Sequence, residues 1–266
     1  MMFAPHRREQ ILQLLHQHKQ VIVKDLARQL KVSEGTLRAD LRQMEEEGLL
    51  ERTHGGAVPV RSKKPSFQDL RVTYRTELNT ELKQAIGRKA AELVHQGQCI
   101  LLDASSTVLE LAKALVECDY LTVVTNGVEA ALTLNRNPRI NVILIGGVLR
   151  PGSGSVEGVL GRTILEEIHA DLFFTSSLGF TLEEGMTDFS LYEAELKKLM
   201  AANASRIVAL LDHTKLDRRS IATSVQTRAV HTIITDDGAD PAFLRRISGI
   251  EIHIADSSAE HRHWTE

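Results

Sequence analysis

The sequence contains few residues of several kinds, and each scarcity argues against a class of protein. Only two of the 266 residues are cysteine, Cys99 and Cys118, and both stand among apolar residues without metal-ligand spacing. We therefore expect buried free thiols rather than a disulfide framework or a zinc site. No run reaches the ~18 uncharged apolar residues that a membrane span needs, and charges occupy the start of the chain where a secretory signal would be apolar. These absences predict a cytoplasmic protein with no membrane partner.

Net charge is also small, but its distribution is uneven. The formal net charge is −3. Residues 1–64 hold 12 Lys and Arg against 8 Asp and Glu, whereas the rest of the chain holds 20 against 27. A basic segment on an acidic remainder suits a protein that meets a polyanion at one end only. A solvated surface can produce this excess by chance, so charge alone does not identify the partner.

The N-terminal region has the pattern of three short helices followed by a hairpin. Apolar residues recur at helical spacing in three stretches, 11–15, 24–30 and 37–44. Each stretch would bury one face of a helix. Two short strand-like segments around a glycine turn follow within residues 49–58, which predicts a wing. We therefore expect a winged helix-turn-helix DNA-binding domain over residues 1–60.

The third helix of this region would carry the side chains that read DNA. In a helix-turn-helix, the third helix lies in the ~12 Å major groove, with its N-terminal part nearest the bases. Ser33 can cap it, and Arg38 and Arg42 share the face opposite the apolar stripe. The alternative is a protein-docking module, and the two outward arginines favour DNA. The predicted DNA-binding residues are Ser33, Thr36 and Arg38 for bases, and Arg42, Arg52 and His54 for phosphates.

Beyond a linker at residues 61–80, the pattern changes to short apolar runs that alternate with helical stretches. The runs are 100–102, 121–124, 142–145, 172–174, 207–211, 232–234 and 250–254. Continuous apolar strands alternating with helices favour a parallel sheet covered on both faces. We therefore expect an α/β chain whose second domain, residues 81–256, is Rossmann-like and mostly parallel. A tail would follow at 257–266.

Fragments of both regions together form a specific pattern through their order and spacing. In the N-terminal region they run from Val32 to Leu41 and from Glu47 to Ala57. In the second domain they are 103–107, 125–127, 146–147, 193–198, 212–215 and 235–236. These fragments resemble the DeoR family of bacterial transcription regulators, although that family usually has a second arginine where this chain has Ala39. The family's sensor domain is similar to ribose-5-phosphate isomerase. The resemblance implies a regulator, in the first place a repressor, of a carbohydrate-metabolism operon, controlled by a small phosphorylated sugar.

The polar fragments of the second domain fall at the carboxyl ends of predicted strands, where open α/β sheets bind ligands. A turn of hydroxyl side chains opening a helix can hold a phosphate through O–H and backbone N–H groups. Lys215 can add a point charge. Helix capping is the alternative for any one loop, and a helix-surface pair with Glu193 is the alternative for Lys197. The predicted effector-binding residues are Asp103, Ser105, Ser106, Thr107, Thr125, Asn126, Gly146, Gly147, Lys197 and Lys215.

Two positions of the second domain also depart from the family pattern. Ser105 replaces a glycine of the phosphate loop, and a positive φ there would cost a serine about 1 kcal/mol. Leu178 stands where relatives commonly have an aspartate, which weakens sugar-hydroxyl recognition or implies a different effector.

The alternative function is a sugar-phosphate isomerase-like enzyme with an N-terminal interaction module. A general acid/base site needs a positioned carboxylate, and the relevant position carries Leu178. We therefore expect no enzymatic activity, no cofactor and no metal. The expected partners are double-stranded operator DNA and the effector. The two-fold symmetry of palindromic operators also favours a homo-oligomer, a dimer or a tetramer.

Overall fold

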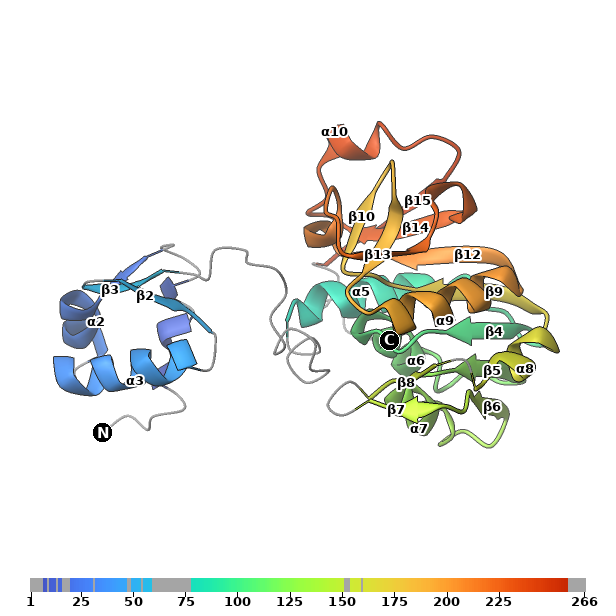
Figure 1. Cartoon of the computed structure of the whole chain (residues 1–266), viewed down its shortest axis with the longest axis horizontal. Coiled ribbons are helices and arrows are strands. Elements are labelled where there is room, and N and C mark those ends of the chain that lie inside the picture. Colours follow the sequence, from blue (N-terminus) through green and yellow to red (C-terminus); the bar gives the residue numbers. More distant parts are fainter. Residues whose placement is uncertain are drawn as a thin grey trace, which may run out of the picture. The chain divides into compact units, whose positions relative to one another are not determined.

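A computed structural model describes the chain at residues 7–8, 10–12, 14–15, 20–30, 32–46, 49–53, 55–58, 78–150, 154–158 and 160–257. The chain divides into two compact units, residues 1–69 and 70–266 (Figure 1). Within the described ranges, no helix combines the length and the apolar character that crossing a bilayer would require. The predicted His54 and the tail from residue 258 lie outside the described residues.

The first unit is a winged helix-turn-helix, as predicted. Residues 7–8, 10–12 and 14–15 are helical. They precede β1 (Val21–Ile22), α2 (Val23–Leu30), α3 (Glu34–Glu46), β2 (Glu51–Thr53) and β3 (Gly56–Val58). The wing strands pair antiparallel in the order β1-β3-β2. Strand β1 is an addition to the prediction, because two residues are too few to establish an alternating pattern.

The helices of this unit form where the apolar spacing predicts them. Helix α2 buries four residues of one face, and α3 buries Leu37, Leu41 and Met44. These side chains share one core with Ile11 and Leu15. The predicted cap is confirmed, because Ser33 Oγ accepts a hydrogen bond from the backbone N–H of Thr36 at 3.1 Å.

The second unit is built on a seven-stranded parallel sheet, and each of the seven apolar runs contributes a strand. The strands are β4 (Cys99–Leu102), β5 (Leu121–Thr125), β6 (Ile140–Leu144), β9 (Ala170–Thr175), β12 (Ala204–Leu210), β14 (Thr232–Asp236) and β15 (Glu251–Ala255). Their order is β15-β14-β12-β9-β4-β5-β6, and every neighbouring pair is parallel. The predicted Rossmann-like fold is confirmed.

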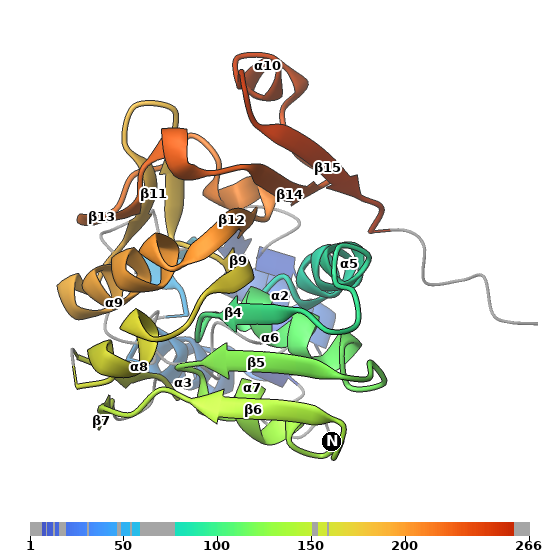
Figure 2. The ribbon, with the colours of Figure 1, turned by 90° about the vertical axis from the view of Figure 1, so that its right-hand side faces the viewer.

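Alternating side chains of each strand enter two separate cores, one on each face of the sheet. Ile100 and Leu102 pack with α5 (Thr80–Ala91), α6 (Ser106–Ala114) and α7 (Val128–Leu134). Leu101, between them, enters the other core, with α8 (Arg162–Glu166) and α9 (Leu191–Ala202). Figure 2 shows the strands of the sheet stacked between these two layers. The sheet is therefore buried on both faces, which is why its strands read as unbroken apolar runs.

Several short elements of this unit were not predicted. Strands β10 (Gly179–Thr181), β11 (Gly185–Asp188) and β13 (Ala222–Val225) form a separate antiparallel sheet. Strands β7 (Val148–Leu149) and β8 (Val156–Glu157) form a hairpin. Helix α10 (Pro241–Leu244) and the one-turn helices η1 (His213–Lys215) and η2 (Thr227–Ala229) complete the unit. These elements are too short or too polar to give a periodic apolar signal.

The two cysteines are free thiols, but the prediction that they are buried was wrong. Cys99 and Cys118 are both only partly buried. Cys99 is the first residue of β4, and Cys118 follows the end of α6. Positions at the ends of elements lie near the domain surface even when their neighbours in sequence are core residues.

The strand order of the large sheet creates one position where a ligand is expected. From β4 the chain proceeds to β5 and β6 on one side, and it then returns to build β9, β12, β14 and β15 on the other. The carboxyl ends of β4 and β9 are therefore neighbours from which the following segments diverge. Such a topological switch point is where open α/β sheets form their binding crevice.

Candidate functional site

Helix α3 presents two arginines to solvent on the side away from its core. Arg38 and Arg42 are exposed, whereas Leu37 and Leu41 beside them are buried. Asp40 is also buried, where it pairs with Arg7 Nε at 2.6 Å and Arg8 Nε at 3.3 Å. These two ion pairs attach the helical segment around residue 7 to α3. Helix α3 is thus held by ion pairs on the side of Asp40, and its side with Arg38 and Arg42 is open to solvent.

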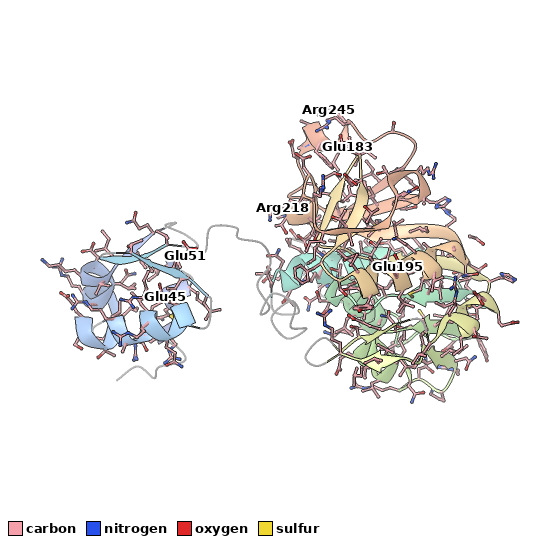
Figure 3. All side chains as sticks on the ribbon, in the orientation of Figure 1. Glu45, Glu51, Glu183, Glu195, Arg218 and Arg245 are labelled. Atoms are coloured by element: carbon pink, nitrogen blue, oxygen red, sulfur yellow. The ribbon has the colours of Figure 1, made fainter. Side chains whose placement is uncertain are left out.

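Two of the arginines predicted to contact DNA, Arg38 and Arg52, already have partners within the first unit. Arg38 Nη2 lies 2.8 Å from Glu34 Oε2, one helical turn earlier. Arg52 donates its backbone N–H to Glu45 Oε1 at 3.0 Å, and its guanidinium lies 3.5 Å from the same carboxylate. Figure 3 labels Glu45 on this unit. Both ion pairs are exposed, so water and a competing phosphate can reach them.

The second unit has a cleft at the switch point between β4 and β9. Its volume is about 150 Å³. Segments that are far apart in sequence supply its walls: the start of α5, the turn into α6, the loop after β9, the end of β11, helix α9 and the segment around η1. The lining residues are Leu78, Asn79, Lys83, Ser105, Ser106, Ser176, Ser177, Leu178, Asp188, Glu193, Lys197, Asp212, Thr214, Lys215 and Arg218.

One wall of the cleft is the hydroxyl-rich turn into α6. Ser105 is the N-cap of α6 at φ −77°, and its Oγ accepts a hydrogen bond from the N–H of Val108 at 3.2 Å. The strain considered for a serine at this position does not arise, because φ is negative. Ser106 and Thr107 follow in the first turn of α6 and are buried. Their backbone N–H groups lie at the positive end of the helix dipole.

Lys215 lies at the same end of the cleft. Its Nζ donates to Ser176 Oγ at 2.9 Å and to Thr107 Oγ1 at 3.2 Å, and it lies 3.4 Å from Asp212 Oδ2. Burial raises the pKa of Asp212, but Lys215 and hydrogen bonds from Thr214 outweigh it and hold the pKa below its ordinary value. Asp212 therefore remains a carboxylate that positions the lysine.

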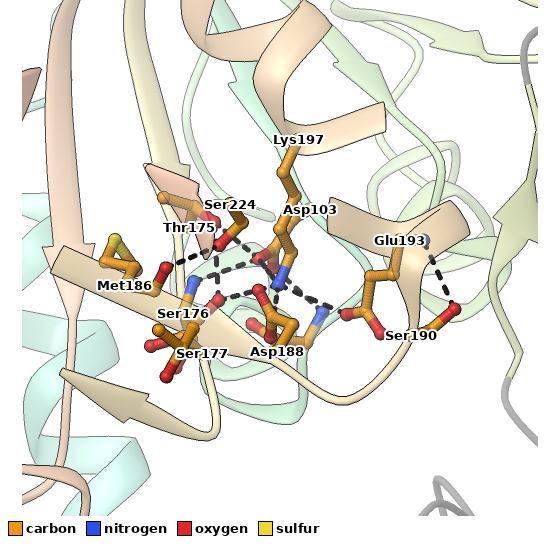
Figure 4. A network of polar contacts seen from close by, with 12 residues as sticks. Asp103, Thr175, Ser176, Ser177, Met186, Asp188, Ser190, Glu193, Lys197 and Ser224 are labelled. Carbon is orange, nitrogen blue, oxygen red and sulfur yellow. Dashed lines mark hydrogen bonds and ion pairs between the residues drawn. The ribbon is translucent and has the colours of Figure 1, made fainter. Parts of the chain in front are cut away.

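Lys197, predicted as an effector-site residue, lines the cleft and is buried, so the alternative of a lysine on the helix surface was wrong. The expected pair with Glu193 does form, at 3.1 Å. The same Nζ also lies 3.1 Å from Asp188 Oδ1 and 3.3 Å from Asp103 Oδ2, and it donates to the carbonyl of Ser176 at 2.7 Å (Figure 4). Burial lowers the pKa of Lys197, but the three carboxylates outweigh it and raise the pKa above its ordinary value. Lys197 is therefore an ammonium at neutral pH.

The two aspartates around Lys197 have opposite properties. Burial raises the pKa of Asp103, but Lys197 and hydrogen bonds involving Ser105, Ser176 and Thr175 outweigh it and lower the pKa. Asp188 has fewer donors, and burial with the nearby Glu193 raises its pKa to about 6 despite Lys197. Asp103 is therefore a structural carboxylate at the end of β4, whereas Asp188 binds a proton at a higher pH than Asp103 does.

The structure places the remaining predicted effector residues beside the cleft, and they do not line it. Thr125 and Asn126 follow β5, where Thr125 Oγ1 accepts from Gly127 N at 3.0 Å and Asn126 Nδ2 donates to Val156 O at 3.1 Å. Gly147 packs against β8, because a Cβ there would stand 2.6 Å from Glu157 O. Gly146 has open space around its Cα. These residues shape the β5 and β6 side of the rim.

Sequence reasoning missed several residues that line the cleft. Asp188, Ser176, Lys83 and Arg218 were not predicted, and Lys83 is buried with its Nζ donating to Leu78 O at 2.6 Å. Of these four residues, only Ser176 could have been predicted, because it directly follows an apolar strand, as the predicted residues do. Asp188 ends a short strand, and the other two lie on segments without such a landmark.

Comparison with known proteins identifies both units. The family described as the DeoR C terminal sensor domain matches residues 78–237, and the DeoR-like helix-turn-helix domain matches residues 7–63. The chain is 43% identical over 259 residues to the HTH-type transcriptional regulator GolR of Listeria innocua, covering 96% of this chain and 100% of that protein. It is 32% identical over 246 residues to the lactose phosphotransferase system repressor of Lactococcus lactis, covering 91% and 94%.

Among solved structures, ribose 5-phosphate isomerase A from Methanocaldococcus jannaschii is similar to part of the chain. The sequence identity is 19%, the TM-score is 0.40, and the match covers 52% of this chain and 55% of the isomerase.

Proposed function

This chain belongs to the DeoR family of transcription regulators, and we propose that it represses a carbohydrate-metabolism operon under the control of a phosphorylated sugar. In this proposal the winged helix-turn-helix binds double-stranded operator DNA in the cytoplasm. The cleft at the switch point of the second unit binds the effector. A homo-oligomer would match the two halves of a palindromic operator.

The DNA-reading part of the proposal is supported by the exposed face of α3. Arg38 is placed early on this helix, where a helix-turn-helix contacts base edges, and arginine with guanine is the commonest specific contact. Arg42 lies one turn further along, and Arg52 is on the wing strand β2. Both are suited to phosphates, which set affinity and register without reading sequence.

The effector part is carried by one observation: a basic residue and the hydroxyl-rich first turn of a helix meet at one end of the cleft. Lys215 reaches Thr107 directly, beside Ser106 and the N-cap Ser105. Several N–H and O–H donors and one ammonium thus surround a space large enough for a dianion. The relative named for a lactose phosphotransferase system is consistent with an effector of this class.

Leu178 does not decide against the isomerase alternative. Leu178 does line the cleft, but Asp188 and Glu193 supply carboxylates from other elements. A leucine at 178 therefore does not deprive the cleft of acids. What supports a regulator is the helix-turn-helix on the same chain and the naming of the relatives as transcriptional regulators.

The DNA-binding proposal is tested by selecting operator fragments and measuring affinity by fluorescence anisotropy. We expect Arg38→Ala to weaken specific binding by about 1–3 kcal/mol and to relax preference at one or two base pairs. Arg52→Ala should weaken binding evenly across sequences and reduce the salt dependence. Unchanged operator affinity and preference in Arg38→Ala would contradict the assignment of α3 as the reading helix.

The effector proposal is tested by thermal shift with sugar phosphates and the corresponding free sugars. A ligand at 100 times its Kd adds roughly 2.7 kcal/mol of apparent stability, and only the phosphorylated members should do so. Lys215→Ala should lose this response and keep operator binding. Lys113→Ala is the matched control, since Lys113 lies on α6 but pairs with Glu110 at 2.8 Å outside the cleft lining. Equal shifts with the free sugars would place the effector in another chemical class.

A further inference from the structure

Asp188 is the residue of the cleft whose hydrogen bonding is incomplete. Its side chain is 3% exposed, and its Oδ1 accepts from Lys197 Nζ at 3.1 Å. Its Oδ2 is buried and has no hydrogen-bond partner among the residues that the structure describes. Ser224 is close enough to lower the pKa of Asp188, but the hydrogen bond that its hydroxyl makes with good geometry is to the carbonyl of Met186, at 3.2 Å (Figure 4). A buried acceptor left in this condition costs about 1–3 kcal/mol, and more when it is charged.

The neighbouring cation cannot complete the bonding of Asp188. An ammonium has three protons, and four oxygen atoms surround that of Lys197: Ser176 O at 2.7 Å, Asp188 Oδ1 and Glu193 Oε1 each at 3.1 Å, and Asp103 Oδ2 at 3.3 Å. The donors of Lys197 are therefore all used. Asp103 does not share this shortage, because Ser105 N, Thr175 Oγ1 and Ser176 N also donate to it.

The cleft consequently has two ends of opposite character. Near Lys215 it offers donors and positive charge. Near Asp188 and Glu193 it offers carboxylate oxygens, and three carboxylates including Asp103 face one ammonium. A phosphate is repelled by the second end and attracted by the first. A ligand with a phosphate at one end and hydroxyl groups at the other therefore fits in one orientation only.

We propose that Asp188 determines the specificity of the effector cleft by accepting a hydrogen bond at Oδ2 from a hydroxyl group of the sugar. This proposal rests on the proposed function, since it assumes a phosphorylated sugar in the cleft. A site that holds a buried acceptor for a hydroxyl discriminates strongly against a ligand without it, because the acceptor then stays buried and unpaired. Effectors are thus selected by the presence of one hydroxyl, in addition to their phosphate.

The test is a thermodynamic cycle in which the carboxylate of Asp188 and one hydroxyl group of the ligand are removed separately and together. Pentose 5-phosphates and hexose 6-phosphates are screened by thermal shift on the full chain. The strongest binder and its set of monodeoxy analogues are then measured by calorimetry against wild type and Asp188→Asn. Glu195→Gln is the matched control, because Glu195 is an exposed carboxylate on the nearby helix α9, lies outside the cleft lining and pairs with Lys198 at 2.7 Å. Inorganic phosphate serves as a probe of the other end of the cleft.

We expect wild type and Glu195→Gln to bind one deoxy analogue at least tenfold more weakly than the parent sugar phosphate. In Asp188→Asn the ratio of the two dissociation constants, deoxy analogue to parent, should fall below about threefold. The affinity for inorganic phosphate should change less than twofold. An unchanged ratio for every deoxy analogue overturns the role of Asp188 and leaves the proposed function intact. If no sugar phosphate binds wild type, the proposed function fails and this inference fails with it. A loss of phosphate binding in Asp188→Asn also overturns the inference, because it indicates a general disruption of the cleft.

Discussion

Replacing Lys197 by methionine removes the single positive charge at the centre of the carboxylate cluster and keeps most of the side chain's volume. Asp103, Asp188 and Glu193 lie within 3.3 Å of its Nζ, and the carbonyl of Ser176 would lose its donor. Breaking a buried ion pair by removing one partner typically costs about 3–5 kcal/mol, because the other charge stays buried without compensation. We expect Lys197→Met to lower the unfolding free energy of the second unit by about this amount.

In a unit of this size, a loss of about 3–5 kcal/mol lowers the midpoint of thermal unfolding by roughly 6–20 °C. Differential scanning calorimetry of the full chain measures this shift. Lys198→Met is the matched control, since Lys198 is the next residue on α9 and pairs with Glu195 on the surface. An exposed pair contributes about 0–1 kcal/mol, so this variant should unfold within a few degrees of wild type.

The pH dependence gives a second measurement of the same effect. Without Lys197, the burial that already raises the pKa of Asp188 in the folded protein is no longer opposed by the ammonium, so this pKa rises further above its value in the unfolded state. The folded variant then binds more protons than the unfolded chain, so its stability rises as pH falls from 7.5 towards 5. The difference between the thermal midpoints of wild type and Lys197→Met should therefore become smaller over this pH range. A midpoint within 2 °C of wild type at pH 7.5 would refute the reasoning that the ammonium holds this cluster together.

Three further predictions follow from contacts in the two units. Gly147→Ala should destabilise the second unit by about 1–3 kcal/mol, because its Cβ would stand 2.6 Å from Glu157 O, whereas Gly146→Ala, with open space around it, should change the thermal midpoint little. Asp40→Asn should lower the stability of the first unit by about 1.5–3 kcal/mol, measured by calorimetry, since Arg7 loses its charged acceptor. Effector affinity should rise as pH increases from 5 to 7, because the pKa of Asp188 is raised to about 6 and a donated hydroxyl favours its charged form. Calorimetry in buffers of different ionisation enthalpy should detect the released proton, and Asp188→Asn should remove that part of the release.

The seven strands of the large sheet could be predicted because its central strands are buried on both faces, whereas their order in the sheet could not. The run Ile100 to Leu102 is apolar at every position, since alternate residues enter different cores. The winged helix-turn-helix was predictable for a related reason, as one apolar stripe per helix is enough to define its faces. Both cases depend on local sequence periodicity.

The candidate site was predictable only where its residues follow such a strand or belong to a fragment that resembles the family. Ser105, Ser106 and Lys215 were found in this way. Asp188 was missed, because β11 is four residues long and pairs in a small sheet whose strands give no apolar pattern. The burial of Lys197 was equally inaccessible, since it depends on carboxylates from three separate segments that meet only in the folded chain.

The ion pairs on the proposed DNA-reading face have a consequence for how the protein would search a genome. In the proposed complex with DNA, Arg38 must leave Glu34, and Arg52 must leave Glu45, before either guanidinium can contact DNA fully. On random sequence, only phosphate attraction compensates for this exchange, and the two glutamates near the DNA oppose it. At the operator, a bidentate contact to a base adds its own free energy. We therefore expect short residence on random DNA and rapid release from wrong sites, so that the time spent bound is concentrated at the operator.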